Sequence, residues 1–378
     1  MNGKVEIMKI GVDARSLSEP IAGIGRYTLF LLREMILNSP HEWVLYSHKP
    51  IIHGDWDMSG VKIRTLKPFI KIKGMYFAWL QLILPFWLSQ DQITLFWSPA
   101  HRLPWYMPKR IAKVITIHDL VWKHFPETMR PFGRFLDSHI MPYAINNTDR
   151  IIASSISTAN DIYNESPSAR SITKVIYLAN SLQREIKSEF NNKKYLLFVG
   201  TLEPRKNLRK LLEAYAMFSE SMRQEYPLYI VGGEGWGDQK VPYILNQLGL
   251  KKSVKVLGYI SNQKLEEVYS GAYLFIMPSL YEGFGLPIVE AMSFGLPVIT
   301  SNNSSMPEIG GDAAILVNPN SSSSIYQGIE RVLLSKELWI ELSSNGFKRS
   351  KLFSWNKTSK ETLEVFEDAA SIILRERK

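Results

Sequence analysis

Two glutamates with seven residues between them mark the part of the sequence with the clearest capacity for chemistry. Glu282 and Glu290 flank a turn at residues 283–285, and Pro287 stands where a helix is expected to begin. The apolar run 274–277 before the turn predicts a buried strand. A strand, a glycine-bearing turn and a helix N-terminus together form an anion site, because unpaired N–H groups and the helix dipole point to one place. Because carboxylates repel phosphate, we expect both glutamates to bind hydroxyl groups beside it, as a nucleotide sugar would offer.

Two cations follow an earlier predicted strand. Arg205 and Lys206 come shortly after the run 195–199, and Asn207 is expected to cap the helix that follows. Cations at the carboxyl end of a strand can neutralise a leaving diphosphate, with Arg acting as a bidentate fork and Lys as a point charge. A solvated turn is the alternative interpretation.

The other candidate positions are less specific. His118 ends the predicted strand 113–117, where a lone histidine is more often a structural hydrogen-bonding residue. Gly23 and Gly25 lie between the first strand and the first helix, but Thr28 occupies the third glycine position of a dinucleotide fingerprint. A second glycine-rich segment matches no fingerprint and is interpreted as a flexible loop; it contains Gly232, Gly233, Gly235 and Gly237.

Taken together, these pieces resemble glycosyltransferase family 4, a family of retaining enzymes with the GT-B fold. The resemblance extends along nearly the whole chain and is carried by residues 23–27, 116–120, 200–207 and 279–307, in that order. It implies similarity to bacterial O-antigen and exopolysaccharide mannosyltransferases, with GDP-mannose as the donor. It also implies a retaining reaction by front-face attack with the leaving phosphate as the base, since no carboxylate is clearly placed as a nucleophile.

The resemblance implies a role for each matching residue. Glu290 would bind the ribose, Glu282 the sugar hydroxyls, and the amides near Phe284 the diphosphate. In many relatives an arginine follows the strand glycine directly, but Thr201 stands there in this sequence, so more of the diphosphate charge falls to Arg205. The implied catalytic residues are His118, Glu282, Arg205 and Lys206; the nucleotide-sugar-binding residues are Gly23, Gly283, Phe284, Gly285, Leu286 and Glu290; the acceptor-binding residues are Arg26 and Tyr27.

We expect no obligatory metal and no other cofactor. Asp55 and Asp57 form a D-x-D pair, which holds a divalent cation in another large glycosyltransferase fold. Here it lies between His53-Gly54 and Met58-Ser59-Gly60, which predicts an exposed loop rather than a strand end. The sequence contains no cysteine, which excludes disulfides and thiolate metal sites.

Apolar runs that predict strands alternate with amphipathic stretches that predict helices along the whole chain. Strands are expected at 7–13, 43–47, 61–66, 93–97, 113–117, 151–154, 174–178, 195–200, 228–231, 254–257, 274–277, 298–301 and 314–317. Helices are expected at 25–37, 75–88, 133–146, 157–163, 207–221, 262–270, 286–294, 323–334, 338–351 and 354–374. Such alternation predicts an α/β protein with two doubly wound, Rossmann-like domains that face each other across a cleft.

The predicted domains follow from a polar stretch near the middle of the chain. Residues 1–180 form an acceptor-binding domain, 181–194 a linker and 195–353 a nucleotide-sugar-binding domain. The resemblance implies that the last helix, residues 354–378, crosses back to the first domain.

Charge is unevenly distributed between the halves. The net charge is +9; residues 1–184 hold 22 Lys and Arg against 14 Asp and Glu, or +8, which leaves +1 for the rest. A basic run or stacking motif typical of nucleic-acid binding is missing, so the basic half is expected to face an anionic membrane or a lipid-linked acceptor. Residues 75–88 are too few to span a bilayer and could be a core helix or an interfacial one. The N-terminal residues do not resemble a signal peptide, so we expect a cytoplasmic protein, attached peripherally to the inner face of the plasma membrane.

Other functions remain open at this point. A nucleotide-sugar epimerase or a phosphorylase could use the same fold and the same motifs. A basic module that binds nucleic acid or lipid without catalysis would instead show salt-dependent binding and no saturable nucleotide-sugar site.

Overall fold

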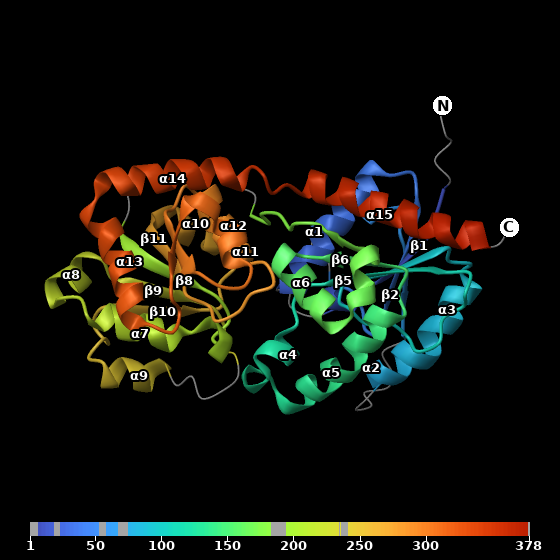
Figure 1. The fold of residues 1–378 in the computed structure, drawn as a ribbon, viewed down its shortest axis with the longest axis horizontal. Coiled ribbons are helices and arrows are strands. Elements are labelled where there is room, and N and C mark those ends of the chain that lie inside the picture. The colour runs from blue at the N-terminus through green and yellow to red at the C-terminus, as the bar shows by residue number, and fades with distance from the viewer. Residues whose placement is uncertain are drawn as a thin grey trace. The chain divides into compact units, whose positions relative to one another are not determined.

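The computed structural model describes residues 7–18, 23–52, 58–66, 75–182, 194–233, 235 and 241–376. The chain divides into two compact α/β units (Figure 1). Unit 1 consists of Met1–Leu120, Phe135–Leu178 and Trp355–Lys378, and unit 2 of Val121–Arg134 and Ala179–Ser354. Most of the predicted linker, residues 183–193, lies outside the described residues.

Unit 1 is built on a seven-stranded sheet with the order β3-β2-β1-β4-β5-β6-β7, in which all pairs are parallel. Its strands are β1 (Lys9–Asp13), β2 (Glu42–Ser47), β3 (Lys62–Thr65), β4 (Leu95–Ser98), β5 (Ala112–Ile117), β6 (Arg150–Ala153) and β7 (Thr173–Val175). The central strands β1, β4 and β5 are buried almost throughout, as expected when helices cover both faces of a parallel sheet.

Unit 2 is built on a six-stranded parallel sheet with the order β10-β9-β8-β11-β12-β13. Its strands are β8 (Tyr195–Val199), β9 (Leu228–Val231), β10 (Val254–Gly258), β11 (Ala272–Met277), β12 (Val298–Ser301) and β13 (Ala314–Val317). The chain starts in the middle of the sheet, moves outward to β10, and returns to the other side at β11. This is the Rossmann order, with its switch point between β8 and β11, so the predicted doubly wound α/β class is confirmed for both units.

Helices fill the connections. In unit 1 they are α1 (Gly23–Asn38), α2 (Met75–Ala78), a π-helical turn (Trp79–Ile83), α3 (Leu84–Gln90), α5 (Pro131–Asn146), α6 (Ile156–Glu165) and α15 (Trp355–Glu376), with α5 beginning among residues grouped with unit 2. In unit 2 they are α4 (Val121–His124), α7 (Leu208–Ala216), α8 (Glu220–Glu225), α9 (Val241–Gln247), α10 (Asn262–Gly271), α11 (Leu286–Ser293), α12 (Met306–Gly310), α13 (Ser322–Leu334) and α14 (Lys336–Ser350). Short 3-10 turns occupy Arg15–Leu17, Pro126–Thr128, Pro167–Ile172, Pro204–Lys206 and Gly311–Ala313.

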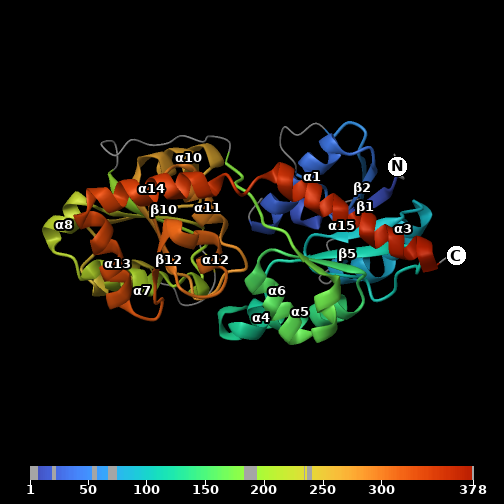
Figure 2. The same ribbon diagram turned by 45° about the horizontal axis from the view of Figure 1, so that its top comes forward.

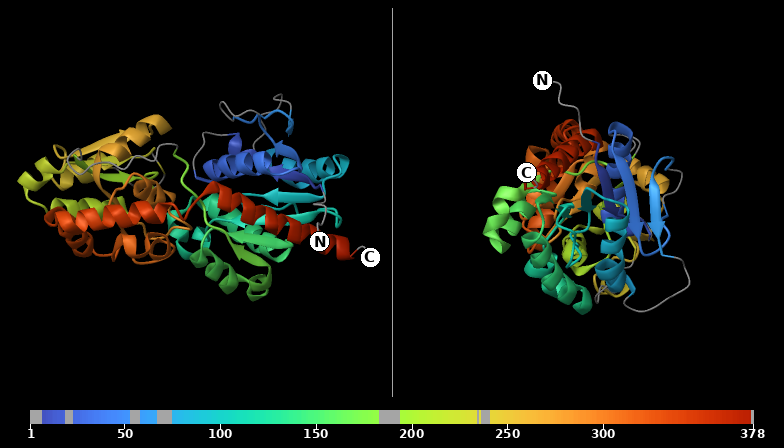
Figure 3. Two further views of the ribbon diagram at one scale, coloured as in Figure 1. Left: turned by 90° about the horizontal axis from the view of Figure 1, so that it is seen from above. Right: turned by 90° about the vertical axis from the view of Figure 1, so that its right-hand side faces the viewer.

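The last helix, α15, packs on unit 1 beside α1, as Figures 2 and 3 show. Its Trp355 stacks on Phe30 of α1 with 5.9 Å between ring centroids. Farther along, Phe366 is fully buried against Trp97 of β4. The Thr358 hydroxyl also donates to the carbonyl of Tyr177, 2.8 Å away. The amphipathic face of this helix thus completes the core of unit 1.

The glycine-rich segment after β9 is needed for close packing. A Cβ at Gly232 would lie 1.9 Å from the carbonyl oxygen of Gly200, and one at Gly235 would lie 2.3 Å from that of Leu202. Only glycine lets this backbone approach the loop after β8 so closely. The interpretation of these two positions as loop flexibility was therefore wrong, and Gly237 lies outside the described residues.

The helical stretch 75–88 has one buried and one exposed side. Trp79, Leu80 and Leu84 are fully buried, whereas Leu82 is 73% and Phe86 64% exposed. Among the described residues, no helix combines the length and the apolar character needed to cross a membrane.

Candidate functional site

The turn between β11 and α11 has the predicted strand–turn–helix form. Gly285 caps α11 in the left-handed conformation, with φ of 94°, and Pro287 lies in the first helical turn. A Cβ at Gly285 would come within 3.1 Å of Ile288. Because a side chain there would be both strained and crowded, this turn needs glycine. Gly283 and Phe284 are buried and Leu286 is half-buried, so the turn packs tightly under the helix start.

A serine-rich segment after β12 holds the backbone of this turn. The hydroxyls of Ser304 and Ser305 donate to the carbonyl of Glu282, at 2.5 and 2.8 Å. Ser305 also contacts the carbonyl of Phe284, and Ser301 donates to that of Ser279 at 2.6 Å. Sequence reasoning assigned these serines no role, although all five residues 301–305 are Ser or Asn beside a predicted phosphate site. The hydroxyls of these serines hold the turn in place by hydrogen bonds to its carbonyl groups.

Glu282 binds both predicted cations directly. Its Oε2 lies 2.8 Å from Nη1 of Arg205 and its Oε1 lies 2.6 Å from Nζ of Lys206. The second Arg205 nitrogen, Nη2, lies 2.6 Å from a carboxylate oxygen of Glu203. All of these side chains are less than one-fifth exposed. The guanidinium charge of Arg205 and the ammonium charge of Lys206 are thus balanced by the two carboxylates in the same cluster.

The cluster keeps Glu282 ionised. Burial alone would raise the pKa of Glu282, but the charges of Arg205 and Lys206 outweigh it and lower this pKa to about 2. The loops after β8 and β11 are also joined through the backbone, because the amide of Leu280 donates to the carbonyl of Arg205 at 2.8 Å. The predicted cation pair after β8 and the predicted turn after β11 therefore lie together at the carboxyl edge of the unit 2 sheet.

Asn207 occupies the predicted cap position of α7 but does not cap it with its side chain. Its backbone is left-handed, with φ of 58°. Its side-chain nitrogen Nδ2 donates to the carbonyls of Pro278 and Pro319, at 2.9 and 2.7 Å. The predicted side-chain cap was wrong because this conformation turns the side chain toward the β11 loop. Asn207 instead ties three loops of unit 2 together.

Glu290 lies in α11 with an exposed fraction of only 2%. The hydroxyl of the fully buried Tyr269 donates to its Oε2 at 3.0 Å. Tyr269 in turn stacks on Phe294, with 5.5 Å between ring centroids. One oxygen of the Glu290 carboxylate is therefore held in place from α10, which sequence reasoning did not foresee.

His118 follows β5 in unit 1 and is held on several sides. Its Nε2 lies 2.9 Å from the carbonyl oxygen of Pro99, and its own carbonyl accepts hydrogen bonds from Ser154 and Thr158. Burial lowers the pKa of His118 to about 4, so the imidazole is neutral at pH 7. With Nε2 donating to Pro99, Nδ1 carries the lone pair and can accept a hydrogen bond.

Tyr27 lies behind His118 rather than at the surface. It is 1% exposed, its ring meets the imidazole edge-on at 4.7 Å, and its hydroxyl pairs with Thr116 at 3.2 Å. This burial leaves its side chain no surface for an acceptor, so the structure places Tyr27 as a support for His118. Arg26 is half-buried in the first turn of α1, and Gly23 begins that helix with φ of 38°. The structure thus brings Tyr27 and His118 into contact, and it brings Glu282, Arg205 and Lys206 into contact in the other unit.

The expectation that no metal is needed is not tested by the described residues. Asp55 and Asp57 lie outside the described residues. Within the described part of the chain, no group of three or more His, Asp or Glu side chains is arranged to hold a metal ion.

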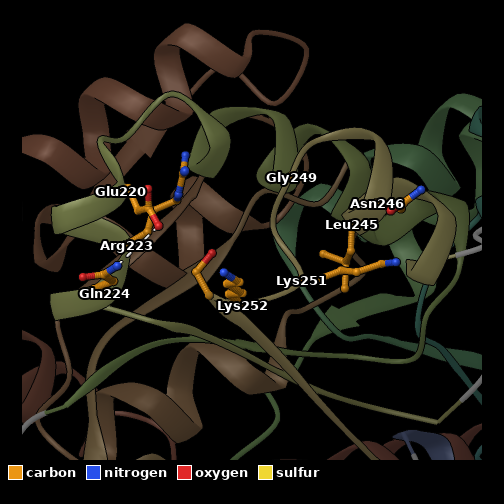
Figure 4. Close-up of a pocket in the computed structure, with 9 residues that line it drawn as sticks. Glu220, Arg223, Gln224, Leu245, Asn246, Gly249, Lys251 and Lys252 are labelled. Atoms are coloured by element: carbon orange, nitrogen blue, oxygen red, sulfur yellow. Dashed lines mark hydrogen bonds between the residues drawn. The ribbon is translucent and has the colours of Figure 1, made fainter.

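A cavity of about 330 Å³ in unit 2 lies away from these residues (Figure 4). Its lining includes Glu220 and Arg223 of α8 and Lys252 and Ser253 before β10. These residues precede β9 and β10, so the cavity lies at the amino ends of the strands. Ligands of open parallel sheets bind at the carboxyl ends instead, and Arg223 is occupied by the carbonyls of Ala216 and Phe218.

Comparisons with known proteins identify the class of unit 2. Residues 180–349 match the model of the family described as glycosyl transferases group 1. This segment is similar to the glycosyltransferase domains of that family. It contains Arg205, Lys206, Glu282 and Glu290, so the candidate site lies inside the matched region.

Relatives and solved structures agree with this class. O-antigen chain mannosyltransferase B of Escherichia coli is 28% identical over 394 residues, which cover 95% of this chain and all of the relative. Serotype-specific mannosyltransferase WbdA of Escherichia coli is 29% identical over 286 residues, and the match spans only 34% of that longer protein. By structure, sucrose-phosphate synthase from Thermosynechococcus elongatus covers 97% of the chain with a TM-score of 0.78 and 18% identity. WaaG, a glycosyltransferase involved in lipopolysaccharide biosynthesis, covers 94% with a TM-score of 0.75 and 14% identity. Together these matches support a glycosyltransferase with the two-domain GT-B fold.

Proposed function

We propose that the chain is a retaining hexosyltransferase of glycosyltransferase family 4. It transfers mannose from GDP-mannose to a lipid-linked glycan acceptor during synthesis of a bacterial surface polysaccharide. The relatives support the sugar and the pathway, since they include O-antigen chain mannosyltransferase B and O-antigen chain mannosyltransferase RfbU of Salmonella typhimurium, 27% identical over 277 residues. The observation that carries the proposal is the contact of Glu282 with Arg205 and Lys206 beside the start of α11.

In this proposal the diphosphate binds the cations and the helix start. Arg205 and Lys206 share their charge between Glu282 and the phosphate oxygens, and the amides near Phe284 and Gly285 supply further donors. Negative charge grows on the leaving diphosphate as the sugar bond breaks. Fixed donors aimed at that charge stabilise the transition state electrostatically.

The two glutamates bind hydroxyl groups in this proposal. Glu282 stays ionised because its pKa lies near 2, so it accepts hydrogen bonds from the sugar. Glu290, held by Tyr269, accepts hydrogen bonds from the ribose. Gly23, the first residue of α1, contacts the donor phosphate, and Arg26 binds the acceptor.

His118 positions the transferred sugar rather than attacking it. A neutral imidazole with its lone pair on Nδ1 can accept a hydrogen bond from a sugar hydroxyl. The acceptor hydroxyl attacks from the same face that the diphosphate leaves, and a leaving-group oxygen takes its proton. The configuration at the sugar carbon is thus retained, and no metal is required.

The test is to incubate the chain with GDP-mannose and a membrane extract that supplies acceptor, and to follow the sugar by NMR. The proposal predicts release of GDP and a new α-linked mannoside. A β-linked product would refute retention. A free epimerised sugar, or phosphate-dependent release of a sugar 1-phosphate, would instead identify an epimerase or a phosphorylase.

We also propose that the protein is cytoplasmic and that unit 1 attaches it to the inner face of the membrane. Leu82 and Phe86 are exposed on the 75–90 helical stretch, and the adjacent Trp105 and Tyr106 are 58% and 75% exposed. Trp105 is tied to that stretch, because its amide donates to Gln81 at 2.7 Å and its ring meets Phe77 at 5.2 Å. Aromatic and aliphatic side chains beside a net positive charge suit an anionic bilayer surface.

Vesicle sedimentation tests this attachment. We expect binding to anionic vesicles, release at high salt and little binding to neutral vesicles. Leu82→Ser with Phe86→Ser should weaken the binding, and so should Lys71→Glu with Lys73→Glu, two positions outside the described residues. Leu37→Ser, at an exposed position of α1, is the matched control. Equal binding to both vesicle types, or to neither, would refute the attachment.

A further inference from the structure

A partly buried polar cluster in unit 1 is not used by any step described so far. It contains Asp13 at the end of β1, Arg15 in the turn after it, His101 and Arg102 after β4, Asp137 of α5 and Tyr76 of α2. We call these six residues the Arg15–Arg102 cluster. β1 and β4 are neighbours at the centre of the sheet, where the strand order reverses. The cluster therefore lies at the carboxyl edge and switch point of unit 1, the usual ligand position in such sheets.

The two guanidinium groups of the cluster share one aromatic ring. The centre of Arg15 lies 4.7 Å, and that of Arg102 5.5 Å, from the centroid of the Tyr76 ring. Each also has its own carboxylate: Arg15 Nε lies 3.4 Å from Asp13, and Arg102 Nη2 lies 3.0 Å from Asp137. These contacts orient both guanidinium groups and balance their charge.

Several polar atoms of the cluster are buried without a hydrogen-bond partner among the described residues. They are Nη1 of Arg15, Nε of Arg102, the Tyr76 hydroxyl, and both ring nitrogens of His101, one of which lies 3.6 Å from Asp137. Trp79, whose ring neighbours Tyr76, adds its indole N–H. Buried polar atoms in folded proteins are almost always paired. One acceptor, Oδ2 of Asp13, is also without a hydrogen-bond partner and lies 3.4 Å from Nε of Arg15. The unpaired arginine, tyrosine and tryptophan donors outnumber this one carboxylate oxygen, which points to an acceptor-rich ligand.

Backbone irregularities surround the same residues. His101 is left-handed, with φ of 49°, a conformation that costs free energy for a residue other than glycine. Its amide donates to the carbonyl of Thr116 at 3.1 Å, which holds the strained turn in place. The turn Trp79–Ile83 is π-helical, a rare form found often at functional sites. Both irregularities lie at or beside residues of the cluster.

We propose that the Arg15–Arg102 cluster binds an oxyanion carried by the glycan acceptor, a phosphoryl or a carboxylate group, and thereby selects acidic acceptors. This inference rests on the proposed transferase function. Guanidinium forks match the paired oxygens of such groups, and a ligand rich in acceptors suits a site in which most of the unpaired atoms can donate. Since Asp13 and Asp137 already balance the arginines, selection depends on directed donors, and binding should depend only weakly on salt.

Calorimetry on the full chain saturated with GDP tests the cluster, because GDP occupies the phosphate-binding residues of unit 2. The probes are α-mannose 1-phosphate, glucuronic acid, inorganic phosphate and the neutral methyl α-mannoside. We expect at least one of the three anions to bind more tightly than methyl α-mannoside, and the preferred anion identifies the phosphoryl or the carboxylate source. Binding of no anion, or equal binding of the neutral sugar, would overturn the proposal.

Two variants assign this binding to the cluster. Arg102→Gln should weaken the binding of the preferred anion about tenfold or more, the loss of affinity expected for a charge-assisted contact. Tyr76→Phe removes only a hydroxyl and keeps the ring, so it should fold normally and weaken binding about threefold to fivefold. Arg110→Gln, which removes an exposed cation of the same unit, should change nothing. Unchanged anion affinity in both cluster variants would refute the assignment. Nucleotide affinity separates the two hypotheses. A wild-type chain that binds GDP but no anion refutes only the cluster, whereas failure to bind GDP, UDP, dTDP and ADP alike refutes the transferase.

Discussion

The charged groups of the two units differ in how completely they are paired. In unit 2, Arg205, Lys206, Glu203 and Glu282 neutralise one another within 2.6–2.8 Å. In unit 1, the Arg15–Arg102 cluster keeps several donors without partners among the described residues. A ligand in unit 2 must therefore share cations with existing carboxylates, whereas a ligand in unit 1 adds partners that the fold does not supply. The difference predicts that variants of the unit 2 site lose stability as well as activity.

The largest effect is expected for Arg205→Ala combined with Lys206→Ala. Turnover should fall at least about 100-fold, as for the loss of a transition-state donor. Because Glu282 would then be buried without a cation, unfolding free energy should fall by about 3 kcal/mol. Adding Glu282→Gln should restore part of the stability but none of the turnover. Urea unfolding and initial rates measure both quantities.

Arg209→Ala with Lys210→Ala is the matched control. These cations also contact one carboxylate, Glu213, at 3.1 and 2.8 Å, but their side chains are 62% and 40% exposed. Such a surface cluster should lose less than about 1 kcal/mol and no activity. If the 205/206 variant behaved like this control, the contact with Glu282 would have no functional importance.

Acid should destabilise the two units over different pH ranges. In unit 2, the pKa of Glu282 falls from 4.5 to about 2, so its stabilising effect is complete above pH 4.5 and is lost as the pH falls toward 2. In unit 1, the pKa of His118 falls from 6.5 to about 4. The unfolded chain therefore takes up this proton first, and stability is lost between pH 6.5 and 4.

Each contribution should be on the order of 3 kcal/mol, since one pKa unit corresponds to about 1.4 kcal/mol. Unfolding free energies of wild type, His118→Gln and Glu282→Gln at pH 7.5, 5 and 3 separate the two ranges. Curves that run parallel for all three proteins would show that neither group has the environment described.

Glu290→Ala should have a smaller effect, confined to nucleotide binding. A lost charge-assisted hydrogen bond costs roughly 1.5–3 kcal/mol, so the dissociation constant of GDP should rise at least tenfold. Tyr269→Phe removes the hydroxyl that holds Glu290, and it should raise the dissociation constant of GDP only about threefold. Calorimetry with GDP measures both, and an unchanged affinity in Glu290→Ala would remove this residue from the site.

Chelation should have no effect at all. Excess EDTA should leave turnover unchanged, and Asp55→Ala with Asp57→Ala should do the same. Activity that disappears with EDTA and returns with manganese would make this pair the leading candidate for metal ligands.

Much of the fold could be predicted because strands and long helices carry strong patterns. Every predicted strand is present within a few residues of its expected bounds, from β1 to β13. The helices α4, α9 and α12 were missed because four to seven residues are too few to show a helical period. The predicted helix 207–221 ends too late: α7 stops at Ala216, and Ser219 begins a new helix, α8, by accepting a hydrogen bond from the amide of Met222.

The site could be predicted only in part. The strand–turn–helix at Gly285 and the position of the two cations after β8 follow from local sequence, and the structure contains both. Other features depend on which loops and helices pack together. These are the pairing of Glu282 with Arg205, the hydrogen bond from Tyr269 to Glu290 and the burial of Tyr27. These contacts join residues 21 to 89 positions apart, and no local pattern encodes them.

The most direct test of the central claim is a thermal-shift series with GDP-mannose and with UDP-, dTDP- and ADP-glucose. The account predicts that GDP-mannose at about 100 times its dissociation constant adds roughly 2.7 kcal/mol of stability. It also predicts that Glu290→Ala loses most of this gain while Arg209→Ala with Lys210→Ala keeps it. A preference for another nucleotide sugar would correct the donor alone. No saturable stabilisation by any of the four would contradict the account.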